Sequence, residues 1–149
     1  MAEWSKEVRR ILKRVLVVDD EPRIVGNILA VLEGAGLHVC AASSGEKALE
    51  RLALEPDFDL LLTDAMMPGM GGFELLRAVR EQPAFASLPV LITVAYPEDL
   101  PLGMATIEAY QQGYAETLTA EFGVPTGVLI KPFHPAILVQ TVNAMLHGT

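Results

Sequence analysis

Five short apolar runs recur along the chain, and segments of mixed polarity separate them. The run VLVV, for example, has charged residues on both sides, which is typical of a strand buried on both of its faces. We therefore expect strands at residues 15–18, 37–41, 59–63, 89–95 and 126–130.

The segments between these runs have the spacing of amphipathic helices. Ile24, Ile28 and Leu32 recur four residues apart and therefore share one helical face. Ser43, followed three residues later by Glu46, predicts a capping box at the start of the second helix. The helices are expected at about 23–33, 43–55, 72–82, 103–122 and 134–146.

This alternation predicts one α/β domain, a doubly wound five-stranded parallel sheet with helices on both faces. Right-handed crossovers restrict the order in which the strands can lie. Ligands of such sheets bind beyond the carboxyl ends of the strands, where the strand order reverses. Polar side chains that directly follow an apolar run are therefore the candidates for a functional site.

Composition and charge narrow the class of protein. A chain of 149 residues, 51% of them hydrophobic, suits one folded domain with a sizeable core. The net charge of −8 argues against a nucleic-acid-binding surface, and no apolar run approaches the roughly 20 residues that span a bilayer. The only cysteine, Cys40, cannot form an internal disulfide, so we expect a cytoplasmic protein.

The start of the chain differs in charge from the rest. The first 14 residues hold five basic and two acidic side chains, against 11 and 19 in the whole chain. Trp4, Val8 and Ile11 fall on one helical stripe. We interpret residues 1–13 as a basic amphipathic extension that packs on the domain formed by 14–149. Contact with a partner or with an anionic membrane is the alternative.

Charged side chains follow three of the apolar runs. Asp19 and Asp20 follow the first run, Asp64 follows the third and Lys131 follows the last. If these strands are neighbours, three carboxylates and one amine meet at one edge of the sheet. Carboxylates in such a cluster repel one another, and oxygen-only ligation suits Mg²⁺. A carboxylate can also attack a phosphoryl group, whose oxygens a lysine and a divalent ion stabilise.

Three motifs, RVLVVDDEP, LLTDAMMPGMGGFELLR and IKPF, have the order and spacing of a known family. The chain resembles the receiver domain of two-component response regulators over about residues 14–94 and 126–147. The resemblance implies the flavodoxin-like receiver fold, with Asp64 as the phosphoacceptor. It also implies that the bond between Lys131 and Pro132 is a cis peptide.

The same resemblance implies a magnesium site. Asp20 and Asp64 would bind Mg²⁺ through their side chains, and Asp19 would act mainly through water. Met66 would add its backbone carbonyl, and Lys131 would contact the phosphoryl oxygens.

Two positions that usually carry the family's conformational switch are apolar in this chain. Val94 occupies the slot of a threonine or serine, Ala95 occupies the small access position after it, and Val128 occupies the slot of an aromatic residue. Thr93 lies one position earlier, and alternation points it to the opposite face of the sheet unless a bulge shifts the register. We expect Mg²⁺ binding and attack by Asp64 to persist, and whether the two apolar residues abolish the switch stays open.

The connection between the fourth and fifth strands is longer than the family normally uses, since Val94 and Lys131 are 37 positions apart. Residues of about 96–125 replace the usual loop and helix. Because long connections in compact domains are often functional, we expect this segment to form a partner-binding or dimer surface.

We interpret the chain as a single-domain response regulator that takes a phosphoryl group on Asp64 with Mg²⁺ and signals by protein–protein contact. The expected donor is a sensor histidine kinase or a phosphotransfer protein, and the expected output is a downstream protein target. We expect no nucleic acid, no membrane span, no output domain before the chain ends at Thr149, and a monomer or weak homodimer. Its expected catalysis is limited to its own phosphorylation and dephosphorylation.

Two alternatives remain open. A pseudo-receiver would keep the fold as a binding module without a phosphorylation-driven switch; Val94 and Val128 favour it, and the acid cluster opposes it. A Mg²⁺-dependent phosphatase with an aspartyl nucleophile usually has a second catalytic aspartate just after the first. Here Ala65 and Met66 follow Asp64, so turnover of phosphate esters is not expected.

Overall fold

The computed structural model describes residues 12–98, 104–122 and 126–147. Its five strands form one sheet in the order β2-β1-β3-β4-β5, and all neighbouring strands are parallel. The order reverses beside β1, as in doubly wound sheets, so the predicted fold class is confirmed. The strands are β1 (Arg14–Val18), β2 (His38–Ala42), β3 (Leu60–Asp64), β4 (Val90–Ala95) and β5 (Thr126–Lys131).

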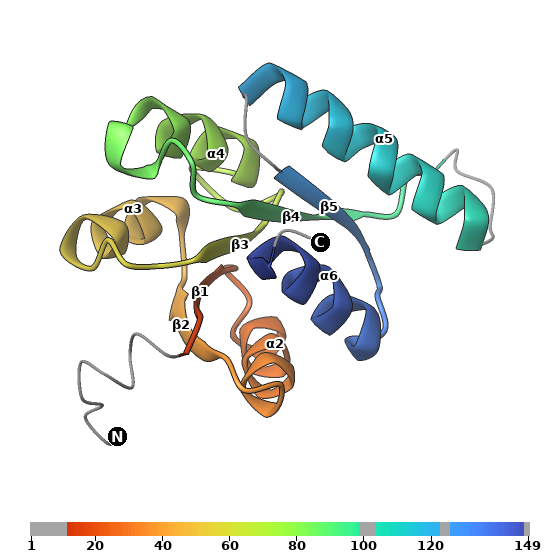
Figure 1. Ribbon diagram of the computed structural model, residues 1–149, viewed down its shortest axis with the longest axis horizontal. Helices are drawn as coiled ribbons and strands as arrows, with labels where there is room; N and C mark the ends of the chain where they lie inside the picture. The colour runs from red at the N-terminus through yellow and green to blue at the C-terminus, as the bar shows by residue number, and fades with distance from the viewer. Residues whose placement is uncertain (1–11, 99–103, 123–125, 148–149) are drawn as a thin grey trace.

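Helices cover both faces of the sheet (Figure 1). They are α2 (Pro22–Gly34), α3 (Gly45–Leu54), α4 (Gly72–Glu81), the short 3₁₀ helix η1 (Pro83–Phe85), α5 (Met104–Phe122) and α6 (Pro135–His147). In the part of the chain that the structure describes, no helix has the length and apolarity that a membrane crossing needs. The predicted extension at 1–13 lies almost wholly outside the described residues, apart from Leu12 and Lys13.

Two apolar clusters, one on each face, hold the layers together. In β1, Leu16 and Val18 join the cluster that includes α3 and α4, whereas Val15 and Val17 join the cluster that includes α2 and α6. Each of these four side chains is at most 1% exposed. This double burial explains why the sequence of β1 is uniformly apolar instead of alternating.

The cap of α3 differs from the prediction. Ser44, not Ser43, is the N-cap, and its side chain accepts a hydrogen bond from Lys47 N at 3.1 Å. With the cap one residue later, Glu46 falls one position short of the place that a capping box requires. Its Oε1 instead accepts a hydrogen bond from Met70 N at 3.3 Å, so Glu46 links α3 to the loop after β3.

Helix α5 lies along the outer edge of β5. The side chain of Gln111 accepts a hydrogen bond from Ile130 N at 2.8 Å, and Thr119 Oγ1 accepts one from Thr126 N at 3.0 Å. Side chains of α5 thus satisfy backbone groups that a sheet edge otherwise exposes. At the opposite edge, within the described residues, β2 pairs with β1 alone.

Candidate functional site

The carboxyl ends of β1 and β3 bring three acids together. Asp19 and Asp20 directly follow β1, and Asp64 is the last residue of β3. Because the two strands are adjacent and parallel, these ends meet at one edge of the sheet. One oxygen from each of the three carboxylates lies within 4.8 Å of the others.

Lys131, at the end of β5, reaches this cluster from the other side. Its Nζ lies 2.9 Å from Asp64 Oδ1, and the two side chains are 30% and 9% exposed. Ala95, the last residue of the intervening strand β4, is in register with Lys131. The bond between Lys131 and Pro132 is cis, as predicted.

The acids differ in how strongly the protein buries them. Asp19 is 3% exposed and Asp64 is 8% exposed, whereas Asp20 is exposed. Burial raises the pKa of Asp19, and the nearby charge of Asp64 adds to this effect. The backbone N–H of Glu21, which donates to Asp19 Oδ1 at 3.0 Å, opposes it in part. A cation between the carboxylates would remove this electrostatic cost.

Thr93 lies beside Asp64 as well. The two residues are paired in the register of β3 and β4, without a bulge, and both are buried. The Thr93 hydroxyl is 3.5 Å from Asp64 Oδ1, at the long limit of a hydrogen bond. Alternation along β4 points Thr93 and Val94 to opposite faces of the sheet. Asp64 points to the same face as Thr93. A single strand's pattern could not reveal this, because register between strands decides it.

Val94 and Val128 pack elsewhere. Both belong to the apolar cluster under α3, α4 and α5, and they are 8% and 5% exposed. Neither residue can offer a hydrogen bond from its side chain to the acids.

The loop after β3 packs tightly against the end of that strand. Gly72 N donates to Ala65 O at 2.9 Å, and a Cβ at Gly72 would overlap the carbonyl oxygen of Asp64. Gly69 has a positive φ of 75°, which glycine adopts without strain. The Met66 side chain, two residues after Asp64, is 77% exposed. The close approach at Gly72 holds the Asp64 backbone in place.

The strand order and the position of this site at the carboxyl edge define a receiver-type α/β domain. The family model described as "Response regulator receiver domain" matches residues 15–143. The chain therefore belongs to the response regulator receiver family of two-component systems, and the predicted family is confirmed.

Several curated proteins have sequences similar to this chain. The transcriptional regulatory protein ResD of Bacillus subtilis is 32% identical over 133 residues, which are 89% of this chain and 48% of ResD. The DNA-binding transcriptional regulator NtrC of Escherichia coli K12 is 37% identical over 116 residues, which are 78% of this chain and 23% of NtrC. The chain thus spans about half the length of ResD and about a quarter of NtrC.

Solved structures resemble the whole fold. The chemotaxis protein CheY4 of Vibrio cholerae aligns with a TM-score of 0.69 and 28% identity, covering 90% of this chain and 98% of that chain. A response regulator receiver domain protein of Clostridium thermocellum aligns with a TM-score of 0.72 and 25% identity, covering 92% and 96%.

Proposed function

We propose that this receiver domain takes a phosphoryl group on Asp64 and signals by protein–protein contact. The observation that carries the proposal is the ion pair of 2.9 Å between Lys131 Nζ and Asp64 Oδ1, beside two further carboxylates. A buried carboxylate next to a lysine and other acids is suited to receive a phosphoryl group whose charge must be balanced.

The chemistry is a single displacement. A carboxylate oxygen of Asp64 forms a bond to phosphorus while the bond from phosphorus to a donor histidine nitrogen breaks. The imidazole leaves with the electron pair and takes up a proton from solvent. Lys131 and Thr93 both contact Oδ1 of Asp64, and no hydrogen bond engages Oδ2 within the described part of the chain. Oδ2 is therefore the oxygen that we assign to the attack.

The donor set fits Mg²⁺, because it consists of carboxylate oxygens close enough to share one ion. Asp20 and Asp64 would bind the ion through their side chains, with Asp19 acting mainly through water and the Met66 carbonyl as a further ligand. When bound, the ion offsets negative charge on the oxygens of the transferred group.

A phosphorylation assay tests this proposal. The protein is incubated with Mg²⁺ and acetyl phosphate, and the adduct is located by peptide mass spectrometry and by its lability to hydroxylamine, which cleaves acyl phosphates. We expect a labile adduct at Asp64 that disappears in Asp64→Asn and in excess chelator. Glu116→Gln, which changes an exposed acid on α5, is the matched control and should be modified as the wild type is. No adduct in the wild type would refute the proposal.

The partners that we propose are a histidine kinase or phosphotransfer protein as donor and a downstream protein as target, in the cytoplasm. The crossover at about 96–125 is the proposed partner or dimer surface, in a chain that is a monomer or weak homodimer. Its described part, α5, has exposed acidic residues such as Glu108 and Glu116. A deletion series that keeps phosphorylation of Asp64 tests the assignment, and unaltered partner binding and unaltered mass in solution would contradict it.

The burial of Val94 and Val128 in one apolar cluster favours a second candidate, a receiver that binds partners without a phosphorylation-driven switch. Hydrogen exchange of the backbone of β4, α5 and β5, with and without beryllofluoride and Mg²⁺, separates the two. Altered exchange there supports a switch. Exchange that changes only in the loops around Asp64 supports the second candidate.

A further inference from the structure

The middle of the loop between β3 and α4, residues 66–70, has one hydrogen-bonded backbone N–H among the described residues. This group is the N–H of Met70, which donates to Glu46 Oε1 on α3 at 3.3 Å. The two ends of the loop are joined to each other, because Gly72 N donates to Ala65 O at 2.9 Å. The middle of the loop is thus held from outside, by a helix that precedes it in the chain.

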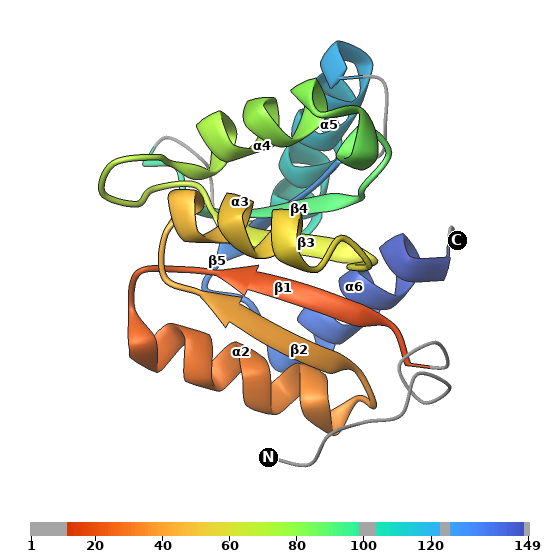
Figure 2. The same cartoon turned by 90° about the vertical axis from the view of Figure 1, so that its left-hand side faces the viewer.

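The packing around this hydrogen bond is close. Figure 2 shows the start of α3 and the loop before α4 side by side. A Cβ at Gly45, the first residue of α3, would lie 2.8 Å from Cγ of Met70, so the glycine lets the methionine side chain approach the helix. A Cβ at Gly69 would lie 3.3 Å from Glu46 Oε2. The loop therefore meets the first turn of α3 through both backbone and side-chain contacts.

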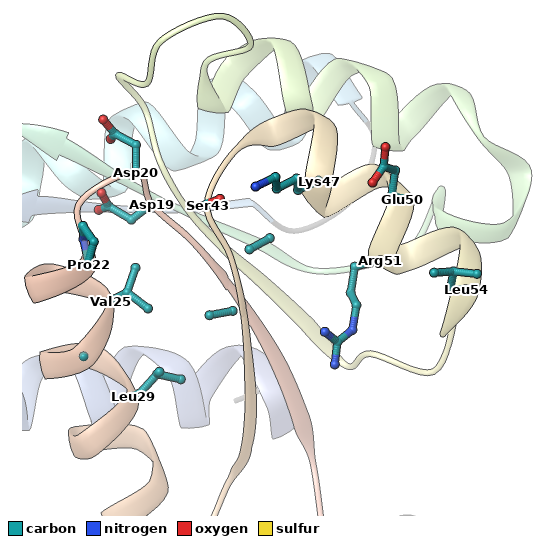
Figure 3. A pocket seen from close by; sticks show the side chains of 13 residues that line it. Asp19, Asp20, Pro22, Val25, Leu29, Ser43, Lys47, Glu50, Arg51 and Leu54 are labelled. Carbon is teal, nitrogen blue, oxygen red and sulfur yellow. The ribbon is translucent and has the colours of Figure 1, made fainter.

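The first turn of α3 is also the part of that helix nearest to the acid cluster. A groove of about 590 Å³ lies between α2 and α3 and is lined by both helices and by the end of β2. Figure 3 shows Ser43 and Lys47, at the start of α3, at the end of the groove where Asp19 and Asp20 lie. Glu46 thus holds the loop close to the carboxylates that are the proposed magnesium ligands.

The held loop carries Met66, whose backbone carbonyl is the remaining proposed ligand of the ion. The Met66 side chain is 77% exposed, so its packing contributes little to the position of the loop. A ligand that is already in place loses less conformational freedom when it binds. A hydrogen bond that fixes the loop in the metal-free protein therefore favours binding of the ion.

We propose that Glu46 is a positioning residue that holds the loop after β3, so that the Met66 carbonyl is in place for Mg²⁺. This role rests on the proposed function, because the carbonyl is a ligand only if the acid cluster binds the ion. The group that matters is the accepting oxygen and not the negative charge. Glutamine also has an accepting oxygen at this position and should replace Glu46.

Amide exchange in the metal-free protein, measured by NMR, tests the hydrogen bond itself. Glu46→Ala removes the acceptor, so the N–H of Met70 should exchange faster than in the wild type. Glu46→Gln should leave this exchange close to the wild-type rate. The N–H of Gly72 should be unaffected in both variants, because its bond to Ala65 O does not involve Glu46.

Calorimetric titration of the full chain with Mg²⁺ tests the effect on the ion. Glu46→Ala should raise the dissociation constant by about two- to fivefold, the effect of losing one exposed hydrogen bond. Glu46→Gln should bind nearly as the wild type does. Glu50→Ala is the matched control, because Glu50 is an exposed acid one turn further along the same helix. Circular dichroism checks that each variant is folded.

A wild-type rate of exchange at Met70 or wild-type affinity for Mg²⁺ in Glu46→Ala overturns this role. Equal loss of affinity in Glu46→Gln or in Glu50→Ala overturns it as well, since the charge and not the hydrogen bond would then be responsible. Faster exchange at both Met70 and Gly72 shows a general loosening and also overturns it, as does a wild type that binds no Mg²⁺. Neither measurement uses phosphorylation. A wild type that binds Mg²⁺ without forming an adduct at Asp64 refutes the proposed function, while these outcomes still decide the role of Glu46.

Discussion

Thr93 and Asp64 are register partners on adjacent strands, and the Thr93 hydroxyl lies 3.5 Å from Asp64 Oδ1. The same oxygen is 2.9 Å from Lys131 Nζ. The hydroxyl beside the proposed phosphoacceptor thus comes from Thr93, one position before Val94. Thr93 points to one face of the sheet, and Val94 points to the other face, where it packs in the apolar cluster under α3, α4 and α5.

Thr93→Val should slow phosphorylation of Asp64. The change keeps the shape of the side chain and removes a hydroxyl worth about 0.5–1.5 kcal/mol, which corresponds to roughly two- to tenfold in rate. Val94→Thr is the control: it should leave the rate nearly unchanged and destabilise the fold, because it buries a hydroxyl among apolar side chains. Rates come from acetyl phosphate kinetics, and a larger effect on rate from Val94→Thr would contradict the assignment.

Gly72→Ala should destabilise the protein, because the new Cβ would overlap Asp64 O and crowd Ala65 Cα at 3.0 Å. Overpacking of this kind typically costs about 1–3 kcal/mol. Gly26→Ala, in the middle of α2, has no atom within 4 Å of the new Cβ and should stabilise, by about 0.5–1 kcal/mol. Urea unfolding of both variants measures the change in the free energy of unfolding. If the two changes have the same sign, the packing described for the loop is contradicted.

Asp19→Asn should raise the thermal midpoint by a few degrees in chelator at neutral pH. Burial raises the pKa of Asp19, so the native state holds this proton more tightly than the unfolded chain does. Stability is therefore lost as pH rises from the ordinary carboxyl value of 3.8 through the raised pKa, and the asparagine avoids that loss. Below this ordinary value the variant and the wild type should converge. In saturating Mg²⁺ the wild type should have the higher thermal midpoint, because only the wild type keeps the full acid cluster that binds the ion.

Arg80→Met should stabilise the protein by about 1 kcal/mol, because a methionine fills similar space without a buried charge. Burial lowers the pKa of Arg80 to about 10. Nη1 donates to Phe85 O at 3.2 Å, but Nε and Nη2 are buried without a partner among the described residues. Chemical unfolding measures the change. Arg77→Met, at an exposed position of the same helix, is the control and should have little effect; a destabilised Arg80→Met would show that the guanidinium contributes net stability.

The family, the alternation of strands and helices and the meeting of Asp19, Asp20 and Asp64 with Lys131 were predictable. The strands and the charged residues directly after them follow from local patterns. The meeting of the acids with Lys131 was expected on the condition that their strands lie close together in one parallel sheet, which the strand order confirms. Strand limits moved by one residue or less. The cap of α3 moved from Ser43 to Ser44, because either serine can cap a helix and the helix begins at Gly45, directly after Ser44.

The sequence by itself determined which residues form the strands and which charged side chains end them, because a short, uniformly apolar run between polar segments is typical of a strand that is buried on both faces of a sheet. Only the tertiary structure decided that Thr93 meets Asp64, that α5 lies along the edge of β5 and that β2, among the described residues, pairs with β1 alone beside a groove between α2 and α3. Each of these depends on the register or placement of elements far apart in the chain. Contacts across the whole sheet set that placement, and no single segment's pattern records it.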